Sequence, residues 1–220
     1  MIAPPHAREA AAASALAQAG FTLIEALVAM AVLAILLSIG VPRMGDWLSA
    51  ARAGSAAGLY AEGYAMARTQ ALANNSQSRL LFIPVAGGQP DWQVDICFRT
   101  TDTPCISDDD WSTTGAAAPG APGAAASFRS LRRSAAGLPA PTILNVAVGP
   151  ASAAGGVYFT PLGWVDTSRN PRATRVDLRP STARPGAFRA QAVVLTLAGV
   201  AVVCDPDPAI VQGDSRWCPQ

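Results

Sequence analysis

The longest apolar run in the chain covers residues 21–41, and its only charged residue is Glu25. A run of about 20 apolar residues is long enough to cross the hydrocarbon layer of a membrane as a helix. An ionisable side chain inside such a helix is costly and normally marks a functional position. The pattern therefore predicts a transmembrane helix over residues 21–41, in which Glu25 needs a partner inside the membrane.

Helical spacing continues past Pro42 to about Asn75, where Asn74 and Asn75 are expected to stop the helix. Because proline lacks a backbone donor, Pro42 is expected to bend the helix where it leaves the membrane. A modest apolar stripe recurs at helical spacing along residues 42–75, at Leu48, Ala51, Ser55, Leu59, Met66 and Ala73. We expect this stripe to pack on a β-sheet.

Beyond Asn75 the apolar positions recur with a period of two, which is typical of strands. Residues 80–85 and 92–98 predict two strands joined by a turn at Gly87 and Gly88. Later strands are expected over residues 142–148, 157–160, 175–178, 190–197 and 200–204, with a turn at Ala198 and Gly199 between the last two. One long helix followed by sequential strands predicts an α+β fold, with the helix packed on an antiparallel β-sheet domain.

Residues 115–126 consist of alanine, glycine and proline, a composition that cannot bury a core and predicts a flexible surface loop. The formal net charge is +1 and all sixteen basic residues are arginine, so the overall charge gives no case for a polyanionic partner.

The four cysteines are not arranged as zinc ligands, because none forms a Cys-x-x-Cys pair and the only histidine is His6. Disulfides are the better interpretation. Four cysteines allow three pairings, and we favour the sequence-local one for a domain outside the cytoplasm, which joins Cys97 to Cys105 and Cys204 to Cys218.

The chain after His6 contains no histidine, so it cannot form the Ser-His-Asp or Cys-His arrangements of catalytic sites. Asp108–Asp110 lack the ligand spacing and central glycine of a calcium loop and are expected to form a solvated turn. Asp205 and Asp207 are interpreted as turn residues, and Trp92 as a core residue of its strand. We therefore expect no enzymatic activity, no cofactor and no metal.

Gly20 is followed by Phe-Thr-Leu-Ile-Glu, and Pro42 closes the apolar run. This arrangement resembles the processing and assembly signal of type IV prepilins and type II secretion pseudopilins. A secretory signal peptide has the opposite order, because its apolar segment precedes the cleavage site. The other alternative is a plain membrane anchor with one tolerated glutamate.

The resemblance implies that residues 1–20 are a cytoplasmic leader and that prepilin peptidase cuts the bond between Gly20 and Phe21. The same enzyme then methylates the new amine of Phe21. It also implies that the Glu25 carboxylate meets the terminal amine of a neighbouring subunit inside the membrane.

A second resemblance covers most of the remaining chain. The segments that carry it are residues 67–72, residues 157–163, and residues 199–204 with the following Asp-Pro. They are similar to the GspH/FimT branch of minor pilins and pseudopilins. This implies a structural subunit of the type II secretion pseudopilus or of the type IV pilus.

The expected partners are other minor and major pilins or pseudopilins, the inner-membrane assembly platform and membrane lipid. The expected location is the bacterial inner membrane, with a single pass, the second half of the helix (42–75) in the periplasm and residues 76–220 as a periplasmic β-rich domain.

Some FimT-like pilins bind DNA through a Gly-Arg-x-Arg sequence in the final hairpin, where this chain has Gly-Val-Ala-Val at residues 199–202. DNA is therefore not an expected partner. A basic stretch remains at Arg169, Arg172, Arg175, Arg179, Arg184 and Arg189, and paired or solvated arginines are the expectation there. The alternative is a binding module displayed on the filament, such as a DNA receptor or an adhesin.

Overall fold

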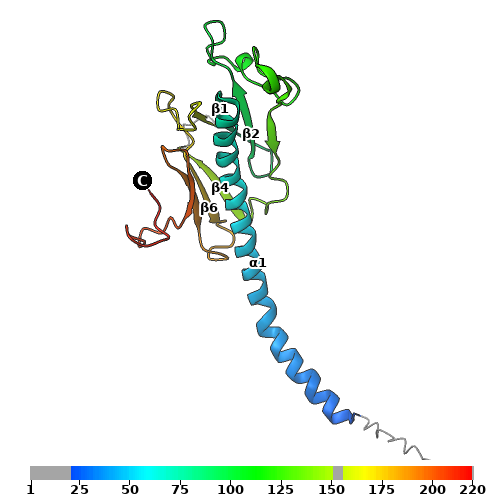
Figure 1. The fold of residues 1–220 in the computed structure, drawn as a ribbon. Coiled ribbons are helices and arrows are strands. Elements are labelled where there is room, and N and C mark those ends of the chain that lie inside the picture. The colour runs from blue at the N-terminus through cyan, green and yellow to red at the C-terminus, as the bar shows by residue number, and fades with distance from the viewer. Residues whose placement is uncertain (1–20, 151–155, 220) are drawn as a thin grey trace, which may run out of the picture. The chain divides into compact units, whose positions relative to one another are not determined.

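A computed structural model describes residues 21–150 and 156–219 of the chain. The chain divides into two compact units, Met1–Arg43 and Met44–Gln220. The α-helix α1 (Leu23–Asn74) contributes its first part to one unit and its second part to the other. Figure 1 shows α1 and the strands that follow it.

The second unit contains eight strands in two antiparallel sheets of four. The first sheet has the order β3-β2-β1-β5 and the second the order β4-β6-β7-β8. The strands are β1 (Gln77–Ile83), β2 (Asp91–Cys97), β3 (Leu131–Arg133), β4 (Leu144–Gly149), β5 (Gly156–Phe159), β6 (Arg175–Pro180), β7 (Gln191–Leu195) and β8 (Ala201–Cys204). This confirms the predicted α+β class, in which a long helix is combined with antiparallel sheet.

The buried face of α1 differs from the predicted stripe, which was wrong. Leu48, Ala51, Ser55 and Ala73 are exposed, and Leu59 and Met66 are only partly buried. The helix instead buries small residues and two tyrosines, at Ala53, Ala56, Ala57, Tyr60, Gly63, Tyr64, Ala67 and Ala71. The prediction gave weight to large aliphatic side chains, whereas close approach of the helix to two sheets selects small ones.

The two tyrosines belong in this core because each hydroxyl finds a backbone acceptor. The Tyr60 hydroxyl donates to the carbonyl of Pro90 at 3.0 Å, and the Tyr64 hydroxyl donates to the carbonyl of Ala173 at 2.7 Å. Burial raises the pKa of Tyr64 far above its ordinary value, so its hydroxyl remains a neutral donor. These bonds attach α1 to the segments that precede β2 and β6.

Part of the outer face of the first sheet is buried, including Arg79 and Asp95. Strand β1 starts at polar residues, before the apolar alternation that predicted a start at residue 80. Arg79 on β1 bonds Asp95 on β2 at 2.8 Å, and its guanidinium lies 4.7 Å from the centre of the Trp111 ring. Trp111 packs with the disulfide between Cys97 and Cys105, which closes the loop after β2 over this face. A buried pair of polar residues of this kind interrupts the alternation of apolar and polar positions by which a strand is recognised in the sequence.

The end of α1 carries the predicted stop. Asn75 adopts a positive φ of 44°, which asparagine tolerates better than most residues. The Ser76 amide bonds the carbonyl of Ala71, and the Asn75 amide bonds that of Leu72. This is the Schellman pattern of helix ends.

Two features of the segment after β2 were not predicted. Residues 115–126 include part of a 3-10 helix, η2 (Gly123–Ser127), and Ala118 is buried. Strand β3 pairs with β2 but has three exposed residues, two of them arginines, and is too short to show an alternation. Charged residues on a short edge strand discourage further pairing.

Gly63 provides a test of the close packing between α1 and the first sheet. A Cβ atom there would lie 3.2 Å from Leu80 and from the Trp92 ring, so Gly63→Val should lower the free energy of unfolding by roughly 1–3 kcal/mol. Chemical unfolding of the protein in detergent, followed by tryptophan fluorescence, measures this.

Gly58 is the matched control on the same helix, because nothing lies within 4 Å of its Cβ position. Gly58→Ala should raise the free energy of unfolding by about 0.5–1 kcal/mol, since alanine favours helix over glycine. Equal effects of the two substitutions would contradict the packing described for Gly63.

Candidate functional site

The residues singled out in the sequence lie at or just before the start of α1. Gly20 lies outside the described residues, while Phe21 and Thr22 directly precede the helix. The Thr22 hydroxyl accepts the amide of Glu25 at 3.3 Å, and the Thr22 carbonyl accepts that of Ala26 at 3.1 Å. Thr22 is therefore the N-cap of α1, and Glu25 lies in the first turn, where the helix dipole favours a negative charge.

No side chain in the described residues donates to the Glu25 carboxylate or pairs with it. Sequence reasoning had overlooked Thr22, although Thr-x-x-Glu is a capping signature that can be found from sequence.

The apolar segment of α1 exposes its side chains throughout. Residues Leu23–Val41 have a mean hydropathy of 2.5, and every residue from 21 to 41 is exposed. Even the large side chains are more than half exposed, with Leu23 at 83% and Leu37 at 52%. Continuous apolar exposure of this extent requires lipid or another chain as cover.

Pro42 lies inside α1, and helix is assigned on both sides of it. The boundary between the two compact units falls one residue later, after Arg43. The bend expected at Pro42 stays a prediction.

A second group of residues forms where three segments distant in sequence meet. These are the end of α1, the turn after β5, and the turn between β7 and β8. Arg68 donates to the carbonyl of Gly163 at 3.3 Å, and Gly163 and Gly199 have positive φ values of 74° and 77°. A Cβ on Gly199 would lie 2.2 Å from the Gly163 carbonyl oxygen, so this contact requires glycine.

The β7–β8 hairpin turns as predicted, with the Gly199 amide bonded to the Thr196 carbonyl at 2.9 Å. Beyond the turn, Val200 and Val202 are exposed, at 46% and 37%. The hairpin therefore presents aliphatic side chains to its surroundings.

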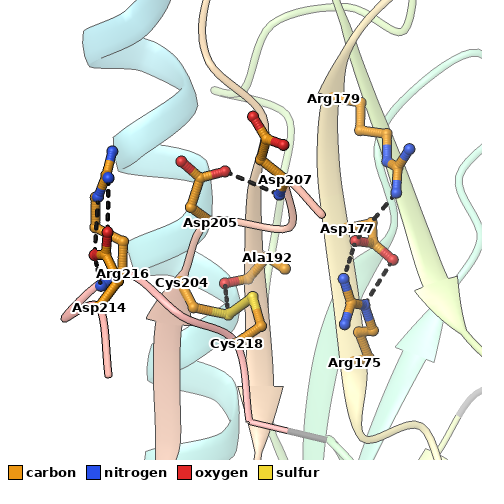
Figure 2. Close-up of a disulfide and its surroundings, with 10 residues drawn as sticks. All are labelled: Arg175, Asp177, Arg179, Ala192, Cys204, Asp205, Asp207, Asp214, Arg216 and Cys218. Atoms are coloured by element: carbon orange, nitrogen blue, oxygen red, sulfur yellow. Dashed lines mark hydrogen bonds and ion pairs between the residues drawn. A yellow bond between two sulfur atoms is a disulfide. The ribbon is translucent and has the colours of Figure 1, made fainter. Parts of the chain in front are cut away.

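Five members of the basic stretch have partners within the chain. Arg175 forms a two-bond pair with Asp177 on β6, both bonds at 3.0 Å, and Arg179 approaches the same carboxylate at 3.8 Å (Figure 2). Arg189 lies 3.3 Å from Asp205. Arg169 lies over the Tyr158 ring at 4.4 Å, and Arg172 bonds Asn170 and Thr167, while Arg184 is exposed. Internal pairing reduces the positive charge that this stretch offers to a ligand.

The second disulfide closes the C-terminal segment onto β8. Cys204 at the end of β8 is bonded to Cys218 (Figure 2). With the bond between Cys97 and Cys105, both disulfides have the sequence-local pairing. The Asp205 amide bonds the carbonyl of Arg216 at 2.8 Å. Hydrogen bonds from Arg216 lower the pKa of Asp214 to about 2, so this pair stays ionised in the segment.

Asp108, Asp205 and Trp92 have structural surroundings. Asp108 pairs with Arg79 at 2.7 Å, and the Asp205 carboxylate accepts the amide of Asp207 at 3.1 Å as in a turn. Trp92 is buried and donates to the carbonyl of Leu59 at 2.9 Å, as expected for a core residue. Within residues 21–150 and 156–219, no three His, Cys, Asp or Glu side chains lie together as metal ligands would.

Comparison with known families gives one match. Residues 16–41 match the family described as the prokaryotic N-terminal methylation motif. Comparisons with curated proteins and with solved structures found no match.

The chain thus carries a prepilin-type motif at the start of an apolar helix that fits a membrane anchor, followed by an α+β domain of pilin-like architecture. These features support a type IV pilin-like or pseudopilin subunit, a structural class of protein rather than an enzyme. The motif implies processing by prepilin peptidase and assembly with other pilins.

The C-terminal disulfide gives a testable prediction for the segment that it closes. Replacing Cys204 and Cys218 together by serine should release residues 205–217 and expose the bond after Arg216 to trypsin. A closed loop of about 15 residues stabilises by roughly 3 kcal/mol in the chain-entropy account. Limited trypsin digestion followed by mass spectrometry measures how fast the bond after Arg216 is cleaved.

The matched control replaces Cys97 and Cys105 by serine, which removes the other disulfide and should leave the bond after Arg216 protected. Peptide mapping of oxidised wild-type protein should find both disulfides and no thiol. Equal protection of the Arg216 bond in both double variants would contradict the role of the second disulfide.

Proposed function

We propose that this chain is a minor pilin or pseudopilin of the GspH/FimT type. It serves as a structural subunit of the type II secretion pseudopilus or of the type IV pilus. Prepilin peptidase cuts it between Gly20 and Phe21 and methylates Phe21, and the mature subunit enters the filament from the bacterial inner membrane.

The observation that carries this proposal is the single carboxylate of Glu25 on an otherwise apolar and uncovered helix. The apolar side chains of such a helix are favourable in lipid, but an unpaired carboxylate there is costly. The amine that cleavage creates on a neighbouring Phe21 is a matching charge, because methylation keeps it positive. Assembly then removes two unpaired charges from a low-dielectric medium.

The GspH/FimT assignment draws support from the junction around Arg68. The three segments similar to that branch are far apart in the sequence, yet Arg68, Gly163 and Gly199 lie in contact. A shared junction explains why these segments occur together in one chain.

The periplasmic location of the second unit draws support from its two disulfides. Disulfides form and persist in oxidising compartments such as the bacterial periplasm. In this proposal residues 1–20 are a cytoplasmic leader, residues 21–41 span the membrane, and residues 42–75 and 76–220 lie in the periplasm.

The proposed cleavage gives a prediction about processing. The mature protein should begin at an N-methylated Phe21, and Gly20→Leu should stay at full length because a side chain there hinders close approach of the backbone to the peptidase. Intact mass of membrane-extracted protein measures both. Gly40→Ala, a change at a glycine inside the helix, should be processed normally. A mature terminus at another residue would contradict the proposal.

The proposed role of Glu25 gives a prediction about assembly. Glu25→Val should insert into the membrane but fail to join the filament, because a neighbour's amine is left unpaired at a cost of roughly 3–5 kcal/mol. Cross-linking to partner pilins measures incorporation.

Ser38→Val is the control for that experiment, since it removes a hydroxyl that donates to the carbonyl of Ile35 within the same helix. This variant should assemble like wild type. Normal incorporation of Glu25→Val would show that Glu25 is not the assembly contact.

The second candidate function is a filament-displayed binding module, and the exposed hairpin allows it to be tested. The wild-type protein should bind duplex DNA weakly or not at all. Because Val200 and Val202 are exposed, replacing both by arginine should be tolerated and should create binding that falls steeply with salt.

A mobility-shift titration at two salt concentrations measures this, with the same positions replaced by glutamate as the control. Submicromolar binding by wild-type protein at physiological salt, lost in Arg172→Ala with Arg175→Ala, would favour the binding module instead.

A further inference from the structure

The cap at the start of α1 lies close to the bond that the proposed peptidase would cut. Thr22 accepts the Glu25 amide through its hydroxyl, and α1 begins at the next residue, Leu23. Phe21 and Thr22 are outside the helix. The bond between Gly20 and Phe21 therefore lies two residues before the first helical residue.

The sequence on both sides of this bond favours helix. Residues 9–19 consist of alanine with glutamate, serine, leucine and glutamine, and most of these residues have high helix propensity. The apolar run follows directly after the bond. Gly20 has a low helix propensity, and Thr22 caps the start of α1.

A helical backbone is a poor substrate for a peptidase. The amide and carbonyl groups on each side of a helical bond are engaged in hydrogen bonds four residues away. A peptidase site must instead receive the bond extended, with these groups available. An N-cap has non-helical φ and ψ, so the residue that serves as N-cap holds the preceding backbone outside the helix.

We propose that Thr22 is a positioning residue for prepilin processing: its hydroxyl caps α1 and thereby keeps the Gly20–Phe21 bond out of the helix and open to the peptidase. The inference rests on the proposed function. It adds a role for Thr22 that acts through the start of the helix and not through contact with the peptidase.

The cap also explains how Glu25 remains available for assembly. In a complete capping box the glutamate three residues after the cap would bond the cap's own amide. Here the Thr22 half is formed, and among the described residues no donor bonds the Glu25 carboxylate. Thr22 thus sets the helix start without using the charge that assembly needs.

Four variants at one position separate capping from direct recognition of the hydroxyl. Thr22→Ser keeps the hydroxyl and the cap, whereas Thr22→Val keeps the shape and loses both. Thr22→Asn keeps a good cap without a hydroxyl, and Thr22→Ala removes the cap and favours helix.

Full-length protein in membranes is incubated with prepilin peptidase, and cleavage is followed over time by mass. We expect the serine and asparagine variants to be cut within about twofold of the wild-type rate. The valine and alanine variants should be cut about fivefold more slowly, the ratio that corresponds to a lost cap of about 1 kcal/mol.

A second readout tests the cap directly and does not depend on cleavage. Hydrogen exchange of the Glu25 amide, measured in detergent on the same full-length proteins, should be slower in wild type, serine and asparagine variants than in the valine variant. Membrane fractionation checks that all variants insert.

Three outcomes would overturn the inference. Wild-type rates for Thr22→Val would show that the cap is not needed for cleavage. Slow cleavage of Thr22→Asn beside normal cleavage of Thr22→Ser would show that the peptidase reads the hydroxyl itself. If the wild-type protein stays uncut, the proposed function is contradicted, and this inference fails with it regardless of the variants.

Discussion

The physical constraint on which the molecule depends is the cost of one carboxylate on an exposed apolar helical segment. Residues 21–41 are exposed throughout, and Glu25 is the single charge among them. Lipid satisfies the aliphatic side chains but not the carboxylate. In the proposed function, the terminal amine of a neighbouring subunit at the same depth pairs with this carboxylate.

The second half of the same helix solves a different packing problem. It lies against two sheets, and alanines, Gly63 and two tyrosines allow a close approach on that face. The tyrosine hydroxyls bond backbone carbonyls of the segments that precede β2 and β6. One helix thus changes from large aliphatic residues, which suit lipid, to small residues, which suit a dense protein core.

The outer surfaces of the sheets are held by local cross-links and charge pairs. The disulfide between Cys97 and Cys105 closes one loop over the first sheet, where Arg79 and Trp111 are buried. On β6, Asp177 lies between Arg175 and Arg179 and neutralises part of the basic stretch. The domain therefore offers less positive charge than its run of arginines indicates.

The sequence by itself determined the features that depend on neighbouring residues along the chain. These include the apolar helix, its end at Asn75, the turn at Gly199 and most of the strands, because helix stops, turns and alternation are local. The prepilin-type signal was also readable, since it is a short motif of neighbouring residues at the start of the apolar run.

Only the tertiary structure decided which face of α1 is buried, that the strands form two sheets, and that β1 begins with buried polar residues. The same holds for the carboxylates that pair with the arginines, and for the contact of Arg68 with Gly163 and Gly199. The physical reason is that these outcomes depend on residues far apart in sequence. An alanine or an arginine carries no local signal of whether a second sheet or a carboxylate will lie beside it.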